Sequence, residues 1–108
     1  MFLGNTFILN PNFIGIMAKI SVISPIRNEG NVLKELVSRV TKVMASNYGS
    51  NWEFVLVNDA SEDNSKQILE KLNKKNKHLV VFNHEKSKGQ TGCFKTGFDN
   101  AKGPSQAG

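Results

Sequence analysis

Polar side chains able to do chemistry gather in three short segments, each directly after a run of apolar residues. These segments cover residues 24–29, 58–61 and 84–92. The first two supply carboxylate and amide oxygens, and the third supplies lysines. A carboxylate can accept hydrogen bonds from a nucleotide base or ribose, and cations can neutralise its phosphates. These residue types together predict a nucleotide-binding site. The alternative is that Asn28 and Asp59 only cap the helices that follow them.

Other binding and catalytic motifs are imperfect or absent. Residues 89–96 (GQTGCFKT) approximate a phosphate-binding P-loop, but Phe94 stands where that loop requires glycine before Lys-Thr. No G-x-G-x-x-G dinucleotide motif occurs. His78 and His84 have no thiol or carboxylate partner at the sequence spacing of a metal site, and Cys93 has no evident histidine base. We therefore expect Cys93 to pack as a small apolar residue, and we predict no catalytic residue and no metal ligand.

The three polar segments must be positioned by the elements between them, in which β-branched apolar runs alternate with amphipathic stretches. The former predict buried strands and the latter predict helices. The strands are expected at residues 20–23, 52–57 and 79–82, and the helices at 31–45, 65–75 and 91–101. This alternation predicts an α/β fold with three α/β/α layers around a parallel sheet. Right-handed crossovers give the strand order 3-2-1, which is half of a doubly wound, Rossmann-like sheet.

The predicted sheet has two consequences for function. Ligands of open α/β sheets bind beyond the carboxyl ends of the strands, where all three polar segments would lie. The first strand would also form an edge of the sheet, although its residues are apolar and uncharged. An unpaired apolar edge is a template for pairing with another chain, so we expect self-association through this edge.

Composition limits the chain to one globular domain. It has 108 residues, 39% of them hydrophobic, and a single cysteine, which excludes an internal disulfide. The net charge of +5 arises in the second part of the chain, because residues 66–108 contain nine basic and three acidic side chains. This excess implies an anionic partner, unless the lysines form only a solvated surface. Nucleic acid is disfavoured because no aromatic side chains are interleaved with the lysines for base stacking.

Residues 1–18 are interpreted as an N-terminal extension. They contain no basic residue, so they lack the positively charged start of a secretory signal. Met17 stands just before the first strand pattern, which suggests that it is the natural start; a short amphipathic anchor is the alternative. We expect the domain itself at residues 19–103 and a tail at residues 104–108.

Three motifs, in this order, resemble the family 2 glycosyltransferases, which have the GT-A fold. Residues 20–29 (ISVISPIRNE) resemble the opening strand of that family, which usually ends in P-x-Y/F-N-E. Residues 54–63 (FVLVNDASED) resemble its second strand, usually V-D-D-G-S-x-D. Residues 88–103 (KGQTGCFKTGFDNAKG) resemble G-K/Q-x-x-A-L-x-x-G-F-x-x-A-x-G. The similarity is greatest to polyprenyl-phosphate sugar transferases, such as the dolichol-phosphate mannose synthases, and covers about residues 19–103.

The resemblance implies a site for a nucleotide-sugar donor on these motifs. Asp59 would accept a hydrogen bond from the base, and Lys88 and Lys95 would lie near the phosphates. The full set of implied donor-binding residues is Pro25, Ile26, Arg27, Glu29, Asp59, Ser61, Lys88 and Lys95.

The sequence departs from the family pattern in two ways. Arg27 replaces an aromatic residue, Asn58 an acid and Ala60 a glycine, and alanine disfavours the positive φ that glycine adopts freely. The family continues after the third motif into a strand with D-x-D, whose carboxylates bind Mg²⁺ or Mn²⁺ on the diphosphate. This motif is not found after Gly103. The resemblance therefore implies the N-terminal, nucleotide-binding half of a truncated GT-A domain, expected to bind no cofactor of its own and to be inactive alone.

The resemblance also implies partners and a location. The donor would be a nucleotide sugar, and the acceptor would be a molecule such as a polyprenyl phosphate. We expect the protein in the cytoplasm, at the cytoplasmic membrane surface when it meets such an acceptor. A non-catalytic nucleotide- or phosphate-binding module is the alternative.

Overall fold

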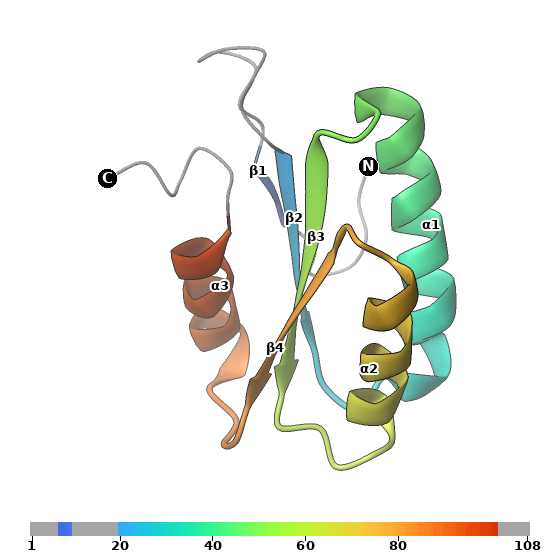
Figure 1. The fold of residues 1–108 in the computed structure, drawn as a ribbon. Coiled ribbons are helices and arrows are strands. Elements are labelled where there is room, and N and C mark those ends of the chain that lie inside the picture. The colour runs from blue at the N-terminus through green and yellow to red at the C-terminus, as the bar shows by residue number, and fades with distance from the viewer. Residues whose placement is uncertain (1–6, 10–19, 102–108) are drawn as a thin grey trace.

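The computed structural model describes residues 7–9 and 20–101, in which one four-stranded sheet separates two helical layers (Figure 1). The strands are β1 (Phe7–Leu9), β2 (Ile20–Ile26), β3 (Trp52–Asp59) and β4 (Leu79–His84). The helices are α1 (Gly30–Tyr48), α2 (Ser65–Lys75) and α3 (Gly89–Asn100). Helices α1 and α2 cover one face of the sheet, and α3 covers the other.

The sheet has the order β1-β2-β3-β4, and β2, β3 and β4 run parallel. In their register, Val55 of β3 lies between Ile23 of β2 and Val80 of β4. The predicted α/β class and the order 3-2-1 of the three predicted strands are confirmed, because β4, β3 and β2 follow one another across the sheet. The boundaries move slightly: α1 extends three residues beyond its predicted end, to Tyr48, and α3 begins earlier than predicted, at Gly89.

Strand β1 was not predicted by the sequence pattern. It pairs antiparallel with β2, so that Phe7 lies opposite Ile23 and Leu9 opposite Ser21. The prediction of an open edge along β2 is therefore wrong at residues 21–23, and the physical reason for self-association through this stretch is removed. The rest of the predicted extension at residues 1–18 and the predicted tail at 104–108 lie outside the described residues.

The alternation of side chains along the strands builds a separate core on each face of the sheet. All eight residues of β3 are buried, so this central strand contributes to both cores. The larger core lies under α1 and α2 and includes Trp52, Phe54 and Leu56 of β3. The smaller core lies under α3. It consists of buried Ile23, Val55, Val57, Cys93 and Ala101, with half-buried Val80, Phe82, Phe94 and Phe98 around them.

Two glycines allow close approach between elements. A Cβ at Gly97 would collide with the side chain of Ile23, so α3 lies directly against β2. A Cβ at Gly30 would collide with the side-chain oxygen of Asn64, so the N-termini of α1 and α2 lie side by side. These contacts fix how closely α3 packs on β2 and how closely the first residues of α1 and α2 approach each other.

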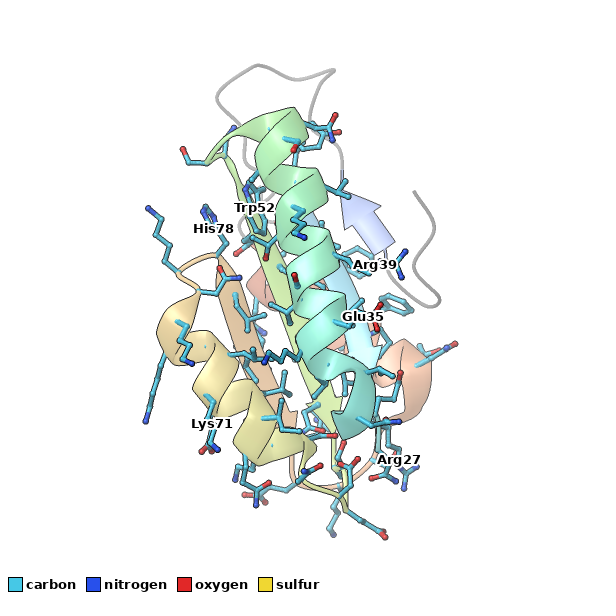
Figure 2. All side chains as sticks on the ribbon, turned by 90° about the vertical axis from the view of Figure 1, so that its right-hand side faces the viewer. Arg27, Glu35, Arg39, Trp52, Lys71 and His78 are labelled. Atoms are coloured by element: carbon cyan, nitrogen blue, oxygen red, sulfur yellow. The ribbon has the colours of Figure 1, made fainter. Side chains whose placement is uncertain are left out.

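The outer face of α1 and the amino end of the sheet are seen in Figure 2. Glu35 and Arg39 are exposed on α1. His78 stacks on Trp52 with ring centroids 4.1 Å apart, and its Nδ1 lies 3.0 Å from the Trp52 carbonyl oxygen. This histidine therefore packs far from the carboxyl ends of the strands. None of the helices in the described part of the chain is long and apolar enough to cross a membrane.

Candidate functional site

The candidate site is at the carboxyl edge of the parallel strands. Strands β2, β3 and β4 end there at Ile26, Asp59 and His84. Asp59 and His84 are partners in the β3–β4 register, so the last residues of two neighbouring strands are both titratable. The loops after these strands lead into α1, α2 and α3. This is the edge at which the sequence predicts ligand binding.

Asp59 connects β3 to the end of β4 and to the start of α3 through four hydrogen bonds. Its Oδ1 accepts from His84 Nδ1 at 2.9 Å and from the backbone N–H of Lys88 at 2.8 Å. Its Oδ2 accepts from Ser87 Oγ at 2.7 Å and from the backbone N–H of Gly89 at 3.0 Å. An ionised carboxylate has about four acceptor positions, and these donors occupy all of them. Asp59 therefore does cap a helix, as the alternative interpretation holds. The helix is α3, however, and not α2, which follows Asp59 in the sequence.

The protonation of this cluster follows from its contacts. Burial raises the pKa of Asp59, but hydrogen bonds from His84, Lys88, Ser87 and Gly89 outweigh it and hold the pKa well below its usual range. The ionised carboxylate has no hydrogen to donate, so His84 Nδ1 carries the proton and donates. In a neutral His84 ring, Nε2 is then an acceptor, and the Thr96 hydroxyl lies 2.8 Å away to donate to it.

Cys93 completes the cluster from the first turns of α3. Its side chain is buried, and its Sγ lies 4.0 Å from His84 Nδ1. Burial, together with the negative charge and hydrogen bonding of Asp59, raises the pKa of Cys93 to about 11, although Lys88 acts in the opposite direction. Cys93 does pack as a small buried residue, as predicted. The prediction was that His84 has no thiol or carboxylate partner at the sequence spacing of a metal site. The fold nevertheless brings two such groups to it, from Asp59, 25 residues away, and from Cys93, nine residues away.

A second polar network links the loops after β2 and β3. The backbone N–H of Asn28 donates to Ser61 Oγ at 3.0 Å, and Ser61 Oγ donates to Asn58 Oδ1. Asn28 Oδ1 in turn accepts from the backbone N–H of Glu62 at 2.7 Å. Asn28 and Ala60 both have positive φ, of 52° and 59°. Asn28 therefore does not cap α1; it connects that loop to the segment before α2.

The start of α1 is joined to the start of α2 by Asp63. Its Oδ1 accepts from the backbone and hydroxyl of Ser65, and its Oδ2 accepts from the backbone N–H of Gly30 at 3.1 Å. The hydrogen bond from the Ser65 hydroxyl is the largest influence that lowers the pKa of Asp63, with the Gly30 N–H acting in the same direction. Glu29 occupies the N-cap position of α1 without a side-chain cap bond, which leaves its carboxylate available to the pocket.

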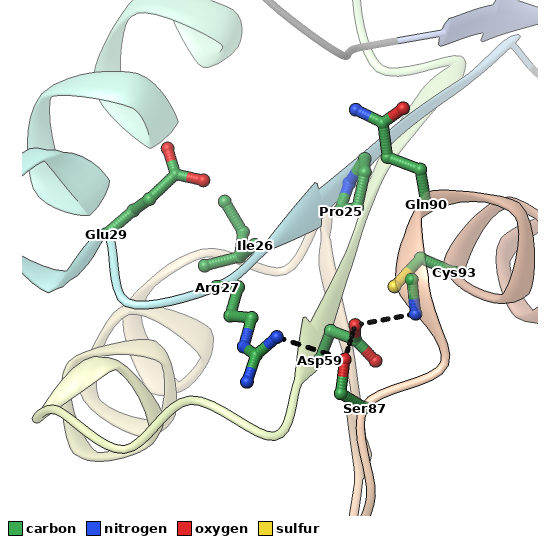
Figure 3. A pocket seen from close by; sticks show the side chains of 9 residues that line it. Pro25, Ile26, Arg27, Glu29, Asp59, Ser87, Gln90 and Cys93 are labelled. Carbon is green, nitrogen blue, oxygen red and sulfur yellow. Dashed lines mark hydrogen bonds between the residues drawn. The ribbon is translucent and has the colours of Figure 1, made fainter.

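A pocket of about 180 Å³ opens beside Asp59, between the end of β2 and the start of α3 (Figure 3). Arg27 spans it, with one guanidinium nitrogen 3.3 Å from Ser87 Oγ. Among the described residues, the side chains of Glu29 and Gln90 have no hydrogen-bond partner. Typical ligand pockets occupy about 300–1,000 Å³, so this one has room for part of a nucleotide, such as its base. Its lining consists of Pro25, Ile26, Arg27, Glu29, Asp59, Ser87, Gly89, Gln90 and Cys93.

The structure brings five of the eight predicted donor-binding residues to this pocket. Ser61 lies outside it, in the network with Asn28 and Asn58. Lys88 reaches the site through its backbone N–H, which donates to Asp59. Lys95 is exposed on α3, where its Nζ is 3.2 Å from Asp99.

Four lining residues were not predicted as donor-binding: Ser87, Gly89, Gln90 and Cys93. They come from the end of the polar segment after β4 and from the first turns of α3. The sequence did contain a signal for these residues, because their segment follows a predicted strand. The helix after such a strand starts at the carboxyl edge of the sheet, where ligands bind. The lysines of this segment do not line the pocket, whereas its uncharged polar residues Ser87 and Gln90 do.

Comparison with known proteins shows the family to which this domain belongs. Residues 21–105 match the family described as Glycosyl transferase family 2. Similar proteins include the undecaprenyl-phosphate 4-deoxy-4-formamido-L-arabinose transferases of Salmonella paratyphi B and Salmonella newport. Each is 31% identical over 86 residues, which cover 79% of this chain and 26% of the relative. The chain thus spans about a quarter of the length of these curated relatives. The match takes in both polar networks and the pocket, and the chain belongs to glycosyltransferase family 2.

Proposed function

We propose that this domain binds the nucleotide part of a nucleotide-sugar donor, for transfer of the sugar to a polyprenyl phosphate at a membrane surface. The pocket at the carboxyl edge of β2 and β3 is the observation that carries the proposal, because it combines a cation with a carboxylate and an amide that have no partner within the described part of the chain. The names of the similar Salmonella proteins support a polyprenyl phosphate as the acceptor. Donor and acceptor both belong to the activity of a whole enzyme, of which this domain would supply the nucleotide site.

The contacts of Asp59 alter the way in which a base would be recognised. Its four acceptor positions are filled, so a base N–H must replace one of the present donors. Ser87 Oγ is the replaceable one, because it belongs to an exposed residue in the pocket wall, whereas Lys88 and Gly89 donate from the backbone. Glu29 needs no such exchange, since its carboxylate has no partner among the described residues. We therefore assign to Glu29 a direct hydrogen bond to the ribose or base. The main role assigned to Asp59 is to position Ser87 and Gly89 in the pocket wall.

The divalent metal used generally in this family does not fit the described residues. Mg²⁺ and Mn²⁺ prefer several oxygen ligands. Of the two carboxylates in the pocket, Asp59 already has both oxygens hydrogen-bonded, which leaves Glu29 alone. The one three-residue cluster of possible ligands found among the described residues contains a thiol and an imidazole. No step of the proposed function is therefore assigned to a metal bound by these residues.

Calorimetric titration of the 108-residue chain with UDP and with GDP tests the proposal. We expect weak binding of one of the two nucleotides. Glu29→Gln should weaken that binding by about 10- to 100-fold, which is the effect of losing one hydrogen bond to a charged group. Glu35→Gln is the matched control, because Glu35 is exposed on α1 away from the pocket, and it should bind as the unmodified chain does. Equal binding by both variants, or no binding of either nucleotide, would overturn the proposal.

A further inference from the structure

Three chemically different metal ligands converge at one wall of the pocket. Asp59 ends β3, His84 ends β4 and Cys93 lies in α3. One ligand atom from each, a carboxylate oxygen, a ring nitrogen and the thiol sulfur, all lie within 4.8 Å of one another. We propose that Asp59, His84 and Cys93 form a binding site for a thiophilic divalent metal ion of the Zn²⁺ class.

The distances leave room for such an ion after small movements. His84 Nδ1 lies 2.9 Å from Asp59 Oδ1 and 4.0 Å from Cys93 Sγ. Zinc bonds of about 2.0 to 2.3 Å in a tetrahedral arrangement place the ligand atoms roughly 3.3 to 3.7 Å apart. The first distance must therefore lengthen and the second shorten, each by about half an ångström. Rotation of the His84 ring and of the Cys93 side chain supplies movements of this size without a change in the backbone.

The chemistry of the three groups selects the metal. Thiolate and imidazole are ligands of zinc, whereas magnesium and manganese prefer oxygen. When the metal binds, His84 coordinates it through Nδ1 and carries the ring proton on Nε2. The Nε2–H then donates a hydrogen bond to Thr96 Oγ1. The thiol proton of Cys93 leaves to solvent, so that a thiolate binds the metal.

The surroundings supply the second layer of contacts that metal sites use. Thr96, 2.8 Å from Nε2, would hold the ring of His84 in the binding orientation. Asp59 would keep three of its four present donors, namely Ser87, Lys88 and Gly89, when the metal replaces His84. The carboxylate is therefore already oriented before the metal arrives.

The site has an entry path and one open position. The side chains of Asp59 and His84 are each 6% exposed, and Asp59 and Cys93 both line the pocket. An ion would enter from the pocket and keep a fourth position facing it, occupied by water. Three protein ligands with one open position is the arrangement of catalytic zinc sites. This inference does not depend on nucleotide binding, and it concerns a metal different from the one that the family generally uses.

Titration of the untagged 108-residue chain with Co²⁺, the spectroscopic substitute for Zn²⁺, tests the inference. We expect one Co²⁺ per chain, a near-ultraviolet thiolate-to-cobalt absorption band, and loss of that band when Zn²⁺ is added. Cys93→Ser and His84→Gln should each abolish the band. His78→Gln is the matched control, because it removes the other histidine of the chain, and it should leave the band intact. Thr96→Val should weaken Co²⁺ binding about tenfold, because a group that orients a ligand has an effect of this size.

The result that overturns the inference is the lack of a thiolate band in the folded chain, or its survival in His84→Gln. The same titration in urea must give no band, since a band there would come from the unfolded chain. X-ray absorption of the zinc-loaded, unmodified chain needs no variant and so decides the matter if the substituted chains do not fold. One sulfur among the nearest ligands supports the site, and zinc surrounded by oxygen and nitrogen alone overturns it.

Discussion

Replacing Ala60 with glycine should stabilise the domain. Ala60 follows β3 with φ of 59°, in the left-handed region that costs an L-residue with a Cβ roughly 1–2 kcal/mol. Glycine relieves this cost but gains freedom in the unfolded chain, which is worth about 0.4–1 kcal/mol in the opposite direction. The difference predicts a gain of about 0.5–1 kcal/mol in the free energy of unfolding. For a domain of this size, each kcal/mol raises the melting temperature by about 4–8 °C.

Urea unfolding followed by circular dichroism measures this change, with thermal unfolding as a second probe. The midpoint should rise and the m-value should stay constant, because the surface exposed on unfolding is the same. Ala45→Gly is the matched control: Ala45 is exposed within α1, where glycine should cost about 0.5–1 kcal/mol. The two identical substitutions should thus have opposite signs. If Ala60→Gly were neutral or destabilising while Ala45→Gly behaved as expected, the reasoning from backbone strain would be refuted.

Three further predictions concern the stability of the site and of the packing around it. Asp59→Asn should lower the free energy of unfolding by about 3 kcal/mol, because it leaves buried donors without their charged acceptor. Urea titration measures this loss. In the control Asp99→Asn, which changes an exposed residue of α3, the urea midpoint should stay unchanged. Since folding lowers the pKa of Asp59, its contribution is present above the unfolded pKa of about 3.9 and is lost as pH falls further. The difference between the unmodified chain and Asp59→Asn should therefore shrink in urea titrations between pH 5 and pH 2, and a constant difference would contradict this assignment. Gly97→Ala should cost about 1–3 kcal/mol on thermal unfolding through its collision with Ile23, whereas Thr91→Ala on the exposed side of α3 should cost far less.

The fold was largely predictable because its elements carry strong local patterns. Apolar runs of a few residues marked β2, β3 and β4, and α2 begins and ends at the residues predicted for it, from Ser65 to Lys75. Strand β1 was not predictable in this way. It has three residues, and its existence depends on pairing with β2, which is a tertiary contact and leaves no periodic signal. A prediction made only from the hydrophobic periodicity of a segment therefore misses a strand that forms because another part of the chain pairs with it.

The candidate site was predictable in place but not in its contacts. The rule that ligands bind beyond the carboxyl ends of parallel strands placed Glu29 and Asp59 correctly at one edge. The partners of Asp59 were not foreseen, because His84 is 25 residues away and meets it only through the register of β3 and β4. Lysine side chains were favoured for their charge, but Lys95 pairs with Asp99 on α3 instead of lining the pocket. Charge complementarity to a ligand says nothing about the face of a helix on which a cation lies.

The unequal cores on the two faces of the sheet have a consequence for local motion. Helix α3 covers the smaller core, and the Asp59 hydrogen bonds join its first residues to the sheet. Segments with little buried apolar surface open before the whole domain unfolds, so amide hydrogens of α3 should exchange with solvent sooner than those of β3. Each such opening would separate Gln90 and Cys93 from Glu29 and dismantle the pocket while the sheet stays intact. A ligand that occupies the pocket would then be detected first as slower exchange along α3, at residues that it does not touch.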